Sequence, residues 1–384
     1  NAIDDFRELA NVLKIPCYPT WNALDVVTSD FEYYGGRIGT YGGGVGRNFG
    51  VQNTDLLLAI GSRISGRITG GNVSSFAREA KKFVVDVDQG LLQDHYQQVP
   101  FDVNIFCDAK LFIKLLIEEA NKLKDLINNS DKSSWTSKAI SWREKYDPVI
   151  KEFFKQTENV HPYVFMRKLS KLADSNAVLI GDCGGNIVVS NHAFKTKYGQ
   201  LNLTNNGNSP MGFSHSASMG CFLADPSRQV ICTIGDGGFN MNIQELQTFL
   251  NYNLKVKTFI LNNHIYGITK AYQETNFEGR SEACGPKGYN PPNFINICKA
   301  YKIKNYTISN HDEIDEIIKK VLEHDGPVVC DINCHEYHVY EPRIFGWKTP
   351  IEDMYPYLPR EEFKENMFIQ PEESWMEPEY PDII

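Results

Sequence analysis

The sequence predicts an α/β protein with two domains, each built on a doubly wound parallel sheet. Short apolar runs, of which 56–60 and 230–234 are the clearest, end in glycine rather than alternating with polar residues. Continuous runs of this kind are typical of parallel strands that are covered on both faces. Segments with helical periodicity separate the runs, and alternating strands and helices form parallel sheets. A polar segment at 128–158 divides the series into two domains.

The first domain is expected to span residues 1–127 as a central α/β domain that lacks its first strand. Its expected elements are, in order, an amphipathic helix at 1–14, a strand at 15–18, strands at 56–60 and 83–88, and a helix at 110–124. The chain starts without methionine and without the character of a signal peptide. We interpret it as an internal piece of a longer protein.

A second α/β domain is expected over residues 159–334. Before it, residues 128–158 are interpreted as a polar linker with a charged helix around 142–154. After it, residues 335–384 are rich in Pro, Glu and aromatics and are expected to form an irregular C-terminal arm. The elements expected in the second domain are helices at 163–173, 214–223 and 244–251, and strands at 177–180, 230–234, 256–261 and 328–332.

The composition is that of a globular chain, with 42% hydrophobic and 23% charged residues. No apolar run reaches the ~18 residues that a membrane helix needs, so no membrane partner is expected. A net charge of −9 without a basic patch in the sequence argues against nucleic-acid binding. The nine cysteines are odd in number and scattered, which is typical of reduced thiols and predicts a cytoplasmic protein.

The strongest functional motif is Gly235-Asp236-Gly237, which follows one predicted strand. Asn263 lies 27 positions after Asp236 and follows the next predicted strand, with a helix between the two. Right-handed crossovers place such strands next to or near each other. We therefore expect both polar side chains in the crevice at the carboxyl ends of the strands, where open α/β sheets bind ligands.

The residue types in this motif indicate a site for magnesium and an anion. Mg²⁺ prefers oxygen ligands in a near-octahedral shell and often shares them with bound phosphates. Asp236 supplies a carboxylate and Asn263 an amide oxygen, and a nearby backbone carbonyl, assigned to Ile265, is the third expected ligand. Gly237 and Gly238 allow close approach of the backbone, and the helix that follows presents free N–H groups to an anion.

This Gly-Asp-Gly and Asn-Asn pattern resembles that of thiamine diphosphate-dependent enzymes. The segment 209–212, Ser-Pro-Met-Gly, resembles the part of those enzymes that holds the pyrimidine ring, where Met211 is the residue that forces the bent cofactor conformer. Positioning of this kind lowers a barrier by about 7–11 kcal/mol at the limit. The cofactor-binding residues that the resemblance implies are Cys183, Gly184, Gly185, Asn186, Ser209, Met211, Gly235, Gly237, Gly238, Tyr266 and Gly267.

The first predicted domain resembles the central domain of acetolactate synthases in residues 38–42, 55–63 and 67–70. Several members of that family hold FAD in this domain as a structural relic, and Asp86 or Asp88 matches the acid near the adenine end. Whether FAD binds this chain is left open, because the fold tolerates its absence.

The resemblance implies a homodimer or homotetramer that carries out carboligation or decarboxylation of a 2-oxo acid. Family members carry an N-terminal domain whose glutamate activates the cofactor, and we expect that glutamate in a preceding segment. No catalytic residue is therefore assigned within this chain. Residues 1–384 alone are expected to be inactive, and decarboxylation of a 2-oxo acid by the purified chain at an ordinary enzymatic rate would contradict this.

Three residues are candidates for contact with substrate. Aligning Gly267 with the family pattern puts Tyr272 where acetolactate synthases place the tryptophan that selects the acceptor, and this change puts the usual acceptor in doubt. His215 lies near the pyrimidine segment and Ile268 follows Gly267. A histidine with a structural role is the competing interpretation of His215.

Other interpretations remain open. The chain is alternatively a catalytically silent homologue that binds thiamine diphosphate or a nucleotide and serves as a scaffold. A nicotinamide dehydrogenase is suggested by glycines at 42–46, but these follow a loop rather than a strand. Cys330, Cys334, His335 and His338 are zinc-ligand types whose spacing fits no standard finger, so packing at a strand end is the preferred interpretation.

Overall fold

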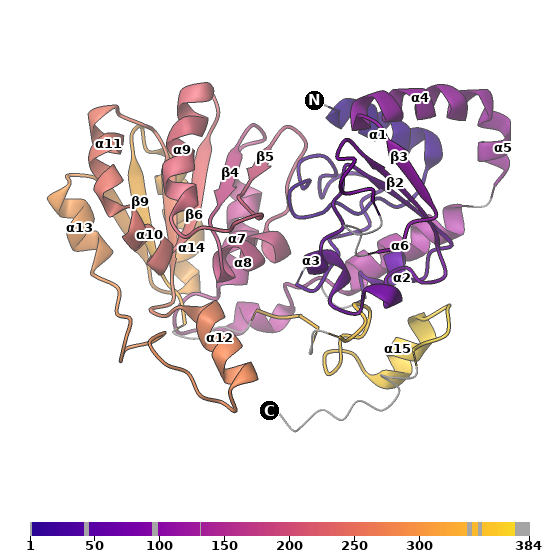
Figure 1. Cartoon of the computed structure of the whole chain (residues 1–384). Helices are drawn as coiled ribbons and strands as arrows, with labels where there is room; N and C mark the ends of the chain where they lie inside the picture. The colour runs from indigo at the N-terminus through magenta and orange to yellow at the C-terminus, as the bar shows by residue number, and fades with distance from the viewer. Residues whose placement is uncertain are drawn as a thin grey trace. The chain divides into compact units, whose positions relative to one another are not determined.

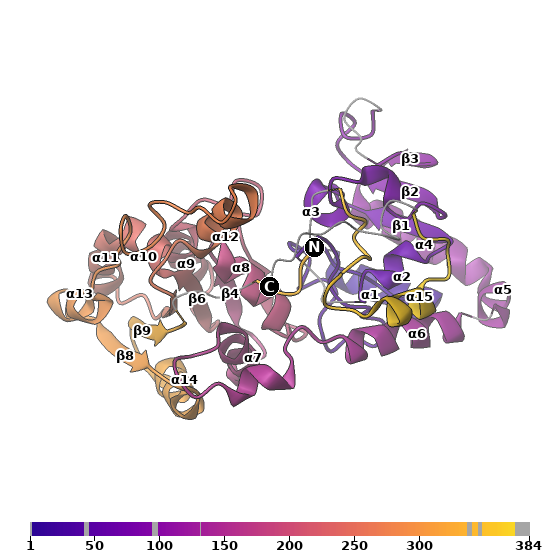
Figure 2. The same ribbon diagram turned by 90° about the horizontal axis from the view of Figure 1, so that it is seen from below.

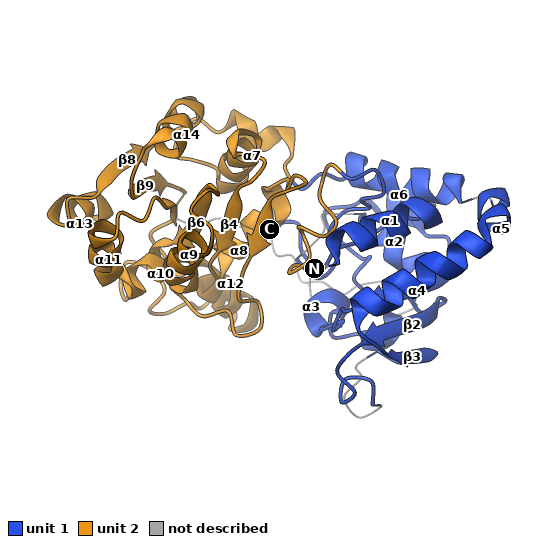
Figure 3. Ribbon diagram, turned by 90° about the horizontal axis from the view of Figure 1, so that it is seen from above, with its two compact units in different colours: residues 1–20, 31–148, 341–384 blue, residues 21–30, 149–340 orange. Residues whose placement is uncertain are grey.

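The computed structural model describes residues 2–41, 46–93, 99–130, 132–335, 340–344 and 348–372. The chain forms two compact units (Figure 3), one comprising residues 1–20, 31–148 and 341–384 and the other residues 21–30 and 149–340. Each unit contains a parallel sheet with helices against it, so the predicted fold class is confirmed. No helix in the described parts of the chain is long and apolar enough to cross a membrane.

The first unit is built on a parallel sheet that, in the described residues, has three strands in the order β1, β2, β3. These are Leu56–Ile60, Lys81–Asp86 and Val103–Phe106. Helix α1 (Ile3–Leu13) packs against α4 (Ala109–Lys122), and apolar side chains of both are buried between them. Its other helical segments are α2 (Phe49–Gln52), α3 (Gly66–Thr69), η1 (Val73–Ser75), α5 (Lys124–Asn129), α6 (Ser133–Lys145) and α15 (Arg360–Asn366).

Strand β3 was not predicted, and two further segments in or near the first unit differ from the prediction. The strand expected at 15–18 is reduced to a single bridge between Cys17 and Tyr34. The helix expected around 142–154 is displaced: α6 ends at Lys145 and a 3-10 turn, η2 (Lys151–Lys155), follows. Pro148 separates the two, because proline lacks an N–H donor and keeps the preceding residue out of the helical region.

Trp142 of α6 is buried in a cluster with Phe49, Leu358 and Phe363. The last two residues belong to the C-terminal arm, and Ile351 of the arm joins the apolar cluster that covers the three-stranded sheet. The described part of the arm therefore completes the core of the first unit. The sequence did not predict these contacts, because the partners lie more than two hundred positions apart in the chain.

The described part of the second unit contains a six-stranded parallel sheet in the order β5-β4-β6-β7-β9-β8. The strands are β4 (Val178–Gly181), β5 (Leu201–Leu203), β6 (Val230–Gly235), β7 (Lys257–Asn262), β8 (Lys304–Ile308) and β9 (Val328–Asn333). The four strands expected here are confirmed within one residue at each end. Two strands, β5 and β8, were not predicted: the first has three residues and the second carries polar side chains within it.

Helices cover both faces of this sheet (Figures 1 and 2). One face carries α7 (Pro162–Leu172), α8 (Gly185–Ala193) and α14 (Ile314–Glu323), and the other carries α9 (Phe213–Ala224), α11 (Leu246–Asn251) and α13 (Phe294–Ala300). Short segments α10 (Asp236–Met241), η3 (Ile243–Glu245), α12 (Gly267–Asn276) and η4 (His311–Glu313) complete the unit. Its core joins strands β4, β6 and β7 to the aromatic side chains Phe239, Phe249 and Phe294.

The strand order reverses between β4 and β6. From β4 the chain moves outward to β5, returns to β6, and then moves in the opposite direction to β7. The loops that leave the carboxyl ends of β4 and β6 therefore diverge and leave a crevice, which is where open α/β sheets bind ligands. The loop after β4 starts at Asp182, and β6 is followed directly by α10, which starts at Asp236.

Candidate functional site

Asp236 and Asn263 leave neighbouring strands at the same edge of the second sheet. Gly235 of β6 is in register with Leu261 of β7, so the residues that follow them emerge side by side. Both polar residues are almost fully buried, with 3% of Asp236 and 5% of Asn263 exposed. The register thus brings the two backbone positions at the centre of the sequence motif to the same edge of the sheet.

The carboxylate of Asp236 is only partly satisfied by the protein. Its Oδ1 accepts a hydrogen bond from the Gly237 N–H at 2.9 Å. Its Oδ2 is buried, and none of the described residues donates a hydrogen bond to it. The Tyr289 hydroxyl lies near the carboxyl and lowers its pKa. Burial outweighs these effects and raises the pKa of Asp236 to about 6. A buried oxygen without a donor is costly, so this site is suited to a cation.

The other two expected cation ligands lie on the turn after β7. The side-chain amide of Asn263 lies against Gly267, where an added Cβ would approach Nδ2 to 2.9 Å. Ile265 is buried, with 2% of its surface exposed. Between them His264 has a left-handed backbone, with φ of 62°, so the chain turns sharply at the strand end. This turn keeps Asn263 and Ile265 next to the sheet edge.

Gly237 lies where two side chains converge. A Cβ at this position would overlap the ring of Tyr266 and approach the terminal methyl of Met211 to 2.9 Å. The Tyr266 ring itself stacks on Tyr289, with centroids 3.9 Å apart. The segment before α9, the start of α10 and the start of α12 therefore meet at one glycine. Met211 stays 39% exposed there, so its side chain is accessible to a ligand.

Asp182 connects the end of β4 to the segment that carries Met211. Its Oδ1 accepts the N–H of Ser214 at 2.9 Å and its Oδ2 accepts the N–H of Gly212 at 3.1 Å. Gly212 has φ of 86°, a left-handed conformation that glycine adopts without strain. Asn242 holds the same turn from the other side, since its Nδ2 donates to the Gly212 carbonyl at 3.0 Å. Sequence reasoning assigned no role to Asp182, and its place directly after a strand was the available signal.

The loop after Asp182 leads into the N-terminus of α8. The Asp182 N–H donates to Asn186 Oδ1 at 3.0 Å, while Asn186 Nδ2 is buried without a partner in the described part of the chain. That nitrogen is a spare donor at a helix start, where free N–H groups favour anions. Cys183 is partly exposed, and burial raises the pKa of its thiol to about 12. The thiol is therefore protonated at neutral pH.

Tyr340 is a residue at the site that sequence reasoning missed. A Cβ at Gly185 or at Gly267 would overlap its phenol ring, so the ring lies against the starts of both α8 and α12. Ile268, expected near substrate, approaches the same region, at 3.8 Å from a Cβ built on Gly184. No local pattern predicts Tyr340, because it stands in the arm, far along the chain from either glycine.

Three of the remaining expected site residues have contrasting environments. Tyr272 on α12 is 61% exposed and packs edge-on against Phe277. Ser209 has a left-handed backbone, with φ of 47°, at the entry to the Met211 segment. His215 lies in the apolar core, stacked on Phe249 with centroids 4.6 Å apart, and has no exposed surface. The folded chain leaves His215 no face open to a substrate.

The buried His215 leads to a prediction about acid stability. Both ring nitrogens lack partners among the described residues, and burial lowers the pKa of the ring to about 3. The folded state therefore keeps the ring neutral, while the unfolded chain takes up a proton as the pH falls below about 6.5. We expect this group to remove about 2 kcal/mol of stability between pH 7 and pH 5.

In the variant His215→Phe this loss is absent, and the new ring keeps the contact with Phe249. Urea unfolding of both proteins at pH 7 and pH 5 measures the difference. An equal pH dependence in the two proteins would mean that the imidazole is charged or solvated in the folded state.

Several further expectations concern other parts of the chain. His338, Gly42, Gly43 and Gly44 lie outside the described residues. Within the described residues, no group of three or more His, Cys, Asp or Glu side chains is arranged to hold a metal ion. Cys330 within β9 and Cys334 directly after it are both buried. Asp86 ends β2, and its Oδ1 accepts the Asp88 N–H at 2.9 Å.

Comparison with protein families matches both units. Residues 182–332 match the C-terminal TPP binding domain of thiamine pyrophosphate enzymes, and residues 1–116 match the central domain of the same enzymes. The first match begins at Asp182 and includes both Asp236 and Asn263. The resemblance drawn from the motifs is thereby confirmed at the level of both domains.

Relatives with assigned names are acetolactate synthases. A probable acetolactate synthase large subunit of Methanococcus aeolicus is 31% identical over 340 residues, 86% of this chain and 55% of the relative. The acetolactate synthase large subunit of Cyanidium caldarium is 28% identical over 334 residues, which are 86% of this chain and 54% of the relative. The acetolactate synthase isozyme 2 large subunit of Escherichia coli strain K12 is 26% identical over 348 residues, which are 89% of this chain and 59% of the relative. The chain spans about half the length of the curated relatives it matches, and with both of its domains matched it belongs to the thiamine pyrophosphate enzyme family.

Proposed function

We propose that this chain is the cofactor-binding part of a thiamine diphosphate-dependent enzyme that carries out carboligation or decarboxylation of a 2-oxo acid, in the manner of an acetolactate synthase. The observation that carries the proposal is the buried Asp236 oxygen without a donor, located at a strand end inside the matched TPP binding domain. The names of the relatives supply the reaction class. The acceptor substrate is left undefined, because Tyr272 stands where acetolactate synthases place the tryptophan that selects it.

The residues present fit a magnesium ion and a diphosphate. Asp236 Oδ2, the Asn263 amide oxygen and the Ile265 carbonyl are the proposed cation ligands, since hard cations take oxygen ligands. The proposed diphosphate donors are the free N–H groups at the start of α10 and the buried Asn186 Nδ2. When bound, thiamine diphosphate supplies an electron sink for carbanion chemistry.

The protein orients the proposed cofactor through the segment that contains Met211. Asp182 and Asn242 fix the Gly212 turn from two sides, and this turn directs Met211 toward Gly237. A side chain held in this way excludes water and limits the conformers of a ligand beside it. Tyr340 shares the space in front of Gly185 and Gly267, so we expect its ring to move or to contact the diphosphate when the cofactor binds.

We propose that the protein is a homodimer or homotetramer. Large apolar side chains are exposed on helices of the second unit and on the segments next to them, and exposed apolar surface is typical of an interface. They are Met211, Leu223, Met241, Leu250, Tyr252, Tyr272 and Phe277, each between 37% and 71% exposed. Light scattering after size exclusion measures the oligomeric state.

The prediction that FAD binds stays open, and the absorbance spectrum of the purified protein tests it.

Titration calorimetry with thiamine diphosphate tests the proposal. Binding is expected with Mg²⁺ present and is expected to be lost with a chelator, because the metal neutralises the diphosphate beside a carboxylate. Release of CO₂ from a 2-oxo acid by the protein that contains this chain then separates an enzyme from a silent homologue. Absence of binding in the presence of Mg²⁺ would refute the cofactor assignment.

A further inference from the structure

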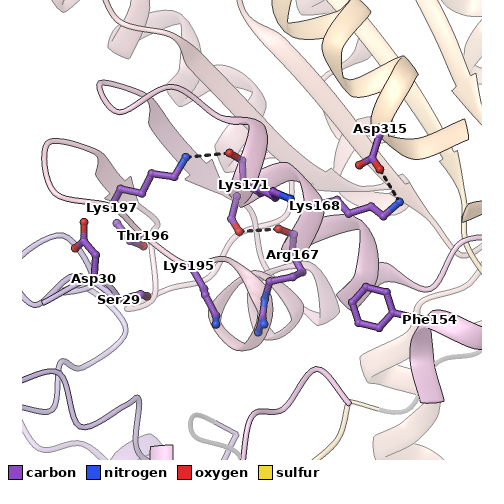
Figure 4. Close-up of a pocket in the computed structure, with 11 residues that line it drawn as sticks. Ser29, Asp30, Phe154, Arg167, Lys168, Lys171, Lys195, Thr196, Lys197 and Asp315 are labelled. Atoms are coloured by element: carbon purple, nitrogen blue, oxygen red, sulfur yellow. Dashed lines mark hydrogen bonds and ion pairs between the residues drawn. The ribbon is translucent and has the colours of Figure 1, made fainter. Parts of the chain in front are cut away.

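A cavity of about 510 Å³ beside α7 has several cations on its wall (Figure 4). The Lys168 ammonium lies 3.0 Å from Asp315 Oδ2, and the Lys197 ammonium donates to the Lys171 carbonyl at 3.1 Å. Figure 4 draws both contacts. Because the protein itself provides partners for these cations, the cavity does not point to a ligand. The feature that does so lies at the carboxyl ends of the strands, beside Asp236.

Two buried polar atoms lie close together at the candidate site, each without a hydrogen-bond partner in the described part of the chain. They are Asp236 Oδ2 and the hydroxyl oxygen of Tyr289. Only 7% of Tyr289 is exposed. Burial and then the charge of Asp236 raise the pKa of Tyr289, so the phenol keeps its proton at neutral pH. A buried donor and a buried acceptor without partners each cost free energy, which indicates that a bound group completes this place.

The backbone and a ring contact hold Tyr289 beside the site. Its N–H donates to the Gly285 carbonyl at 2.7 Å, which closes a tight turn. This turn is joined to the one after β7, since the Tyr266 N–H donates to the Cys284 carbonyl at 2.9 Å. The ring of Tyr289 then stacks on the ring of Tyr266, with centroids 3.9 Å apart. The ring is therefore positioned by contacts that do not involve its hydroxyl.

The carboxylate of Asp236 has capacity for one more donor. An ionised carboxylate offers about four lone-pair positions. Oδ1 uses one of them for the Gly237 N–H, and Oδ2 is the oxygen proposed to bind the cation. A phenol that donates to an ionised carboxylate forms a charge-assisted hydrogen bond, which is stronger than a neutral one. Donors of this kind orient carboxylate ligands and strengthen metal binding.

We propose that Tyr289 is a positioning residue of the cation site, whose hydroxyl donates a hydrogen bond to the Asp236 carboxylate when the cation is bound. The bond holds the carboxylate toward the ion. This inference rests on the proposed function and deepens it, because it adds a residue that determines how tightly the site holds its metal. Tyr289 lies outside the motifs that predicted the site.

Calorimetric titration with thiamine diphosphate at several Mg²⁺ concentrations tests the proposal. Tyr289→Phe removes one oxygen and keeps the ring that stacks on Tyr266. We expect the half-saturating Mg²⁺ concentration to rise by on the order of 10–100-fold, the contribution typical of groups that orient metal ligands. Tyr301→Phe is the matched control, because Tyr301 lies between α13 and β8, toward the amino ends of the strands. Equal Mg²⁺ requirements in the two variants would overturn the proposal.

The stability of the cofactor-free protein separates a positioning role from a structural one. The Tyr289 hydroxyl has no partner among the described residues. Tyr289→Phe is therefore expected to leave the urea midpoint of the cofactor-free protein unchanged or to raise it. A lower midpoint together with weaker cofactor binding would show that the hydroxyl supports the fold, and this would overturn the assigned role.

A double-mutant cycle with Asp236→Asn shows whether the hydroxyl acts through the carboxylate. In the Asp236→Asn background, Tyr289→Phe is expected to change the thiamine diphosphate Kd by about threefold or less, because the charge-assisted bond is already lost. A full effect in that background would mean that the hydroxyl contacts the diphosphate itself, and the assignment would be wrong.

The same titrations distinguish failure of this inference from failure of the proposed function. If the wild-type chain does not bind thiamine diphosphate in the presence of Mg²⁺, the proposed function and the role of Tyr289 are refuted together. If the wild-type chain binds and Tyr289→Phe binds equally well, the role of Tyr289 alone is refuted.

Discussion

Asp236→Asn is expected to lower the affinity for thiamine diphosphate and Mg²⁺ by on the order of 100-fold or more, while making the cofactor-free protein more stable at pH 8. The first effect follows because the amide removes the negative charge proposed to hold the cation. The second follows because the carboxylate is buried and its Oδ2 has no donor with hydrogen-bond geometry among the described residues. Asparagine keeps the shape of the side chain without the charge.

The gain in stability depends on pH in a defined direction. Burial raises the pKa of Asp236 from 3.8 to about 6, so the folded state binds a proton more tightly than the unfolded chain. Ionised Asp236 therefore destabilises the folded protein above pH 6, by about 1–3 kcal/mol. As the pH falls below 6 the carboxyl becomes protonated, and the advantage of Asp236→Asn over wild type disappears toward pH 4.

Urea unfolding at pH 8 and pH 4, together with calorimetric titration of the cofactor, measures both effects. Asp331→Asn is the matched control, because Asp331 is a half-buried acid that accepts a hydrogen bond from the Asn262 Nδ2 at 3.0 Å. An asparagine there can still accept that hydrogen bond, so cofactor affinity is expected to change little. Unaltered cofactor binding by Asp236→Asn would refute the assigned cation site.

Asp182→Ala is expected to destabilise the second unit by about 2–5 kcal/mol and to weaken cofactor binding. The change leaves the backbone N–H groups of Gly212 and Ser214 without their buried acceptor, and each unsatisfied buried donor costs about 1–3 kcal/mol. The turn before α9 is then held by Asn242. Since Met211 sits on this turn, its position beside Gly237 is expected to loosen.

Thermal unfolding and the cofactor titration measure these two consequences. Asp225→Ala serves as control, because Asp225 also accepts a backbone N–H, from Ser227 at 3.1 Å, but in a solvent-exposed hydrogen bond, so a loss below about 1 kcal/mol is expected. Asp182→Asn keeps one acceptor oxygen and is expected to fall between wild type and Asp182→Ala. A cofactor affinity that is independent of Asp182 would show that the Met211 turn does not position the ligand.

The strands that lead to the candidate site were predictable because the local amino-acid sequence determines them. The apolar run at 230–234 and the one at 256–261 are β6 and β7 in the structure. Each run is buried on both faces of a parallel sheet, so its composition alone marks it. A right-handed crossover then places their ends together, which is why the position of Asp236 and Asn263 at one edge of the sheet could be anticipated. Their role as ligands stays a prediction.

Other elements depend on partners that are distant in the chain. Strands β5 and β8 are too short or too polar to be marked by their own sequence, and pairing with β4 and β9 determines them. Burial of Trp142 likewise depends on Phe363 of the C-terminal arm. In each case the stabilising free energy comes from contacts between distant segments of the chain. The hydrophobic periodicity of a short segment does not predict such contacts.

The amino-acid sequence by itself determined the α/β class, the main strands and the glycine and polar positions that follow them, because these depend on hydrophobic pattern and backbone freedom along a short stretch. Tertiary structure alone decided the rest. It placed the Asp182 carboxylate on the Gly212 turn, brought Tyr340 to two helix starts and enclosed His215 in the core. It also gathered cations around one cavity. Burial and charge proximity are properties of the packed chain, so they emerge only when distant segments meet.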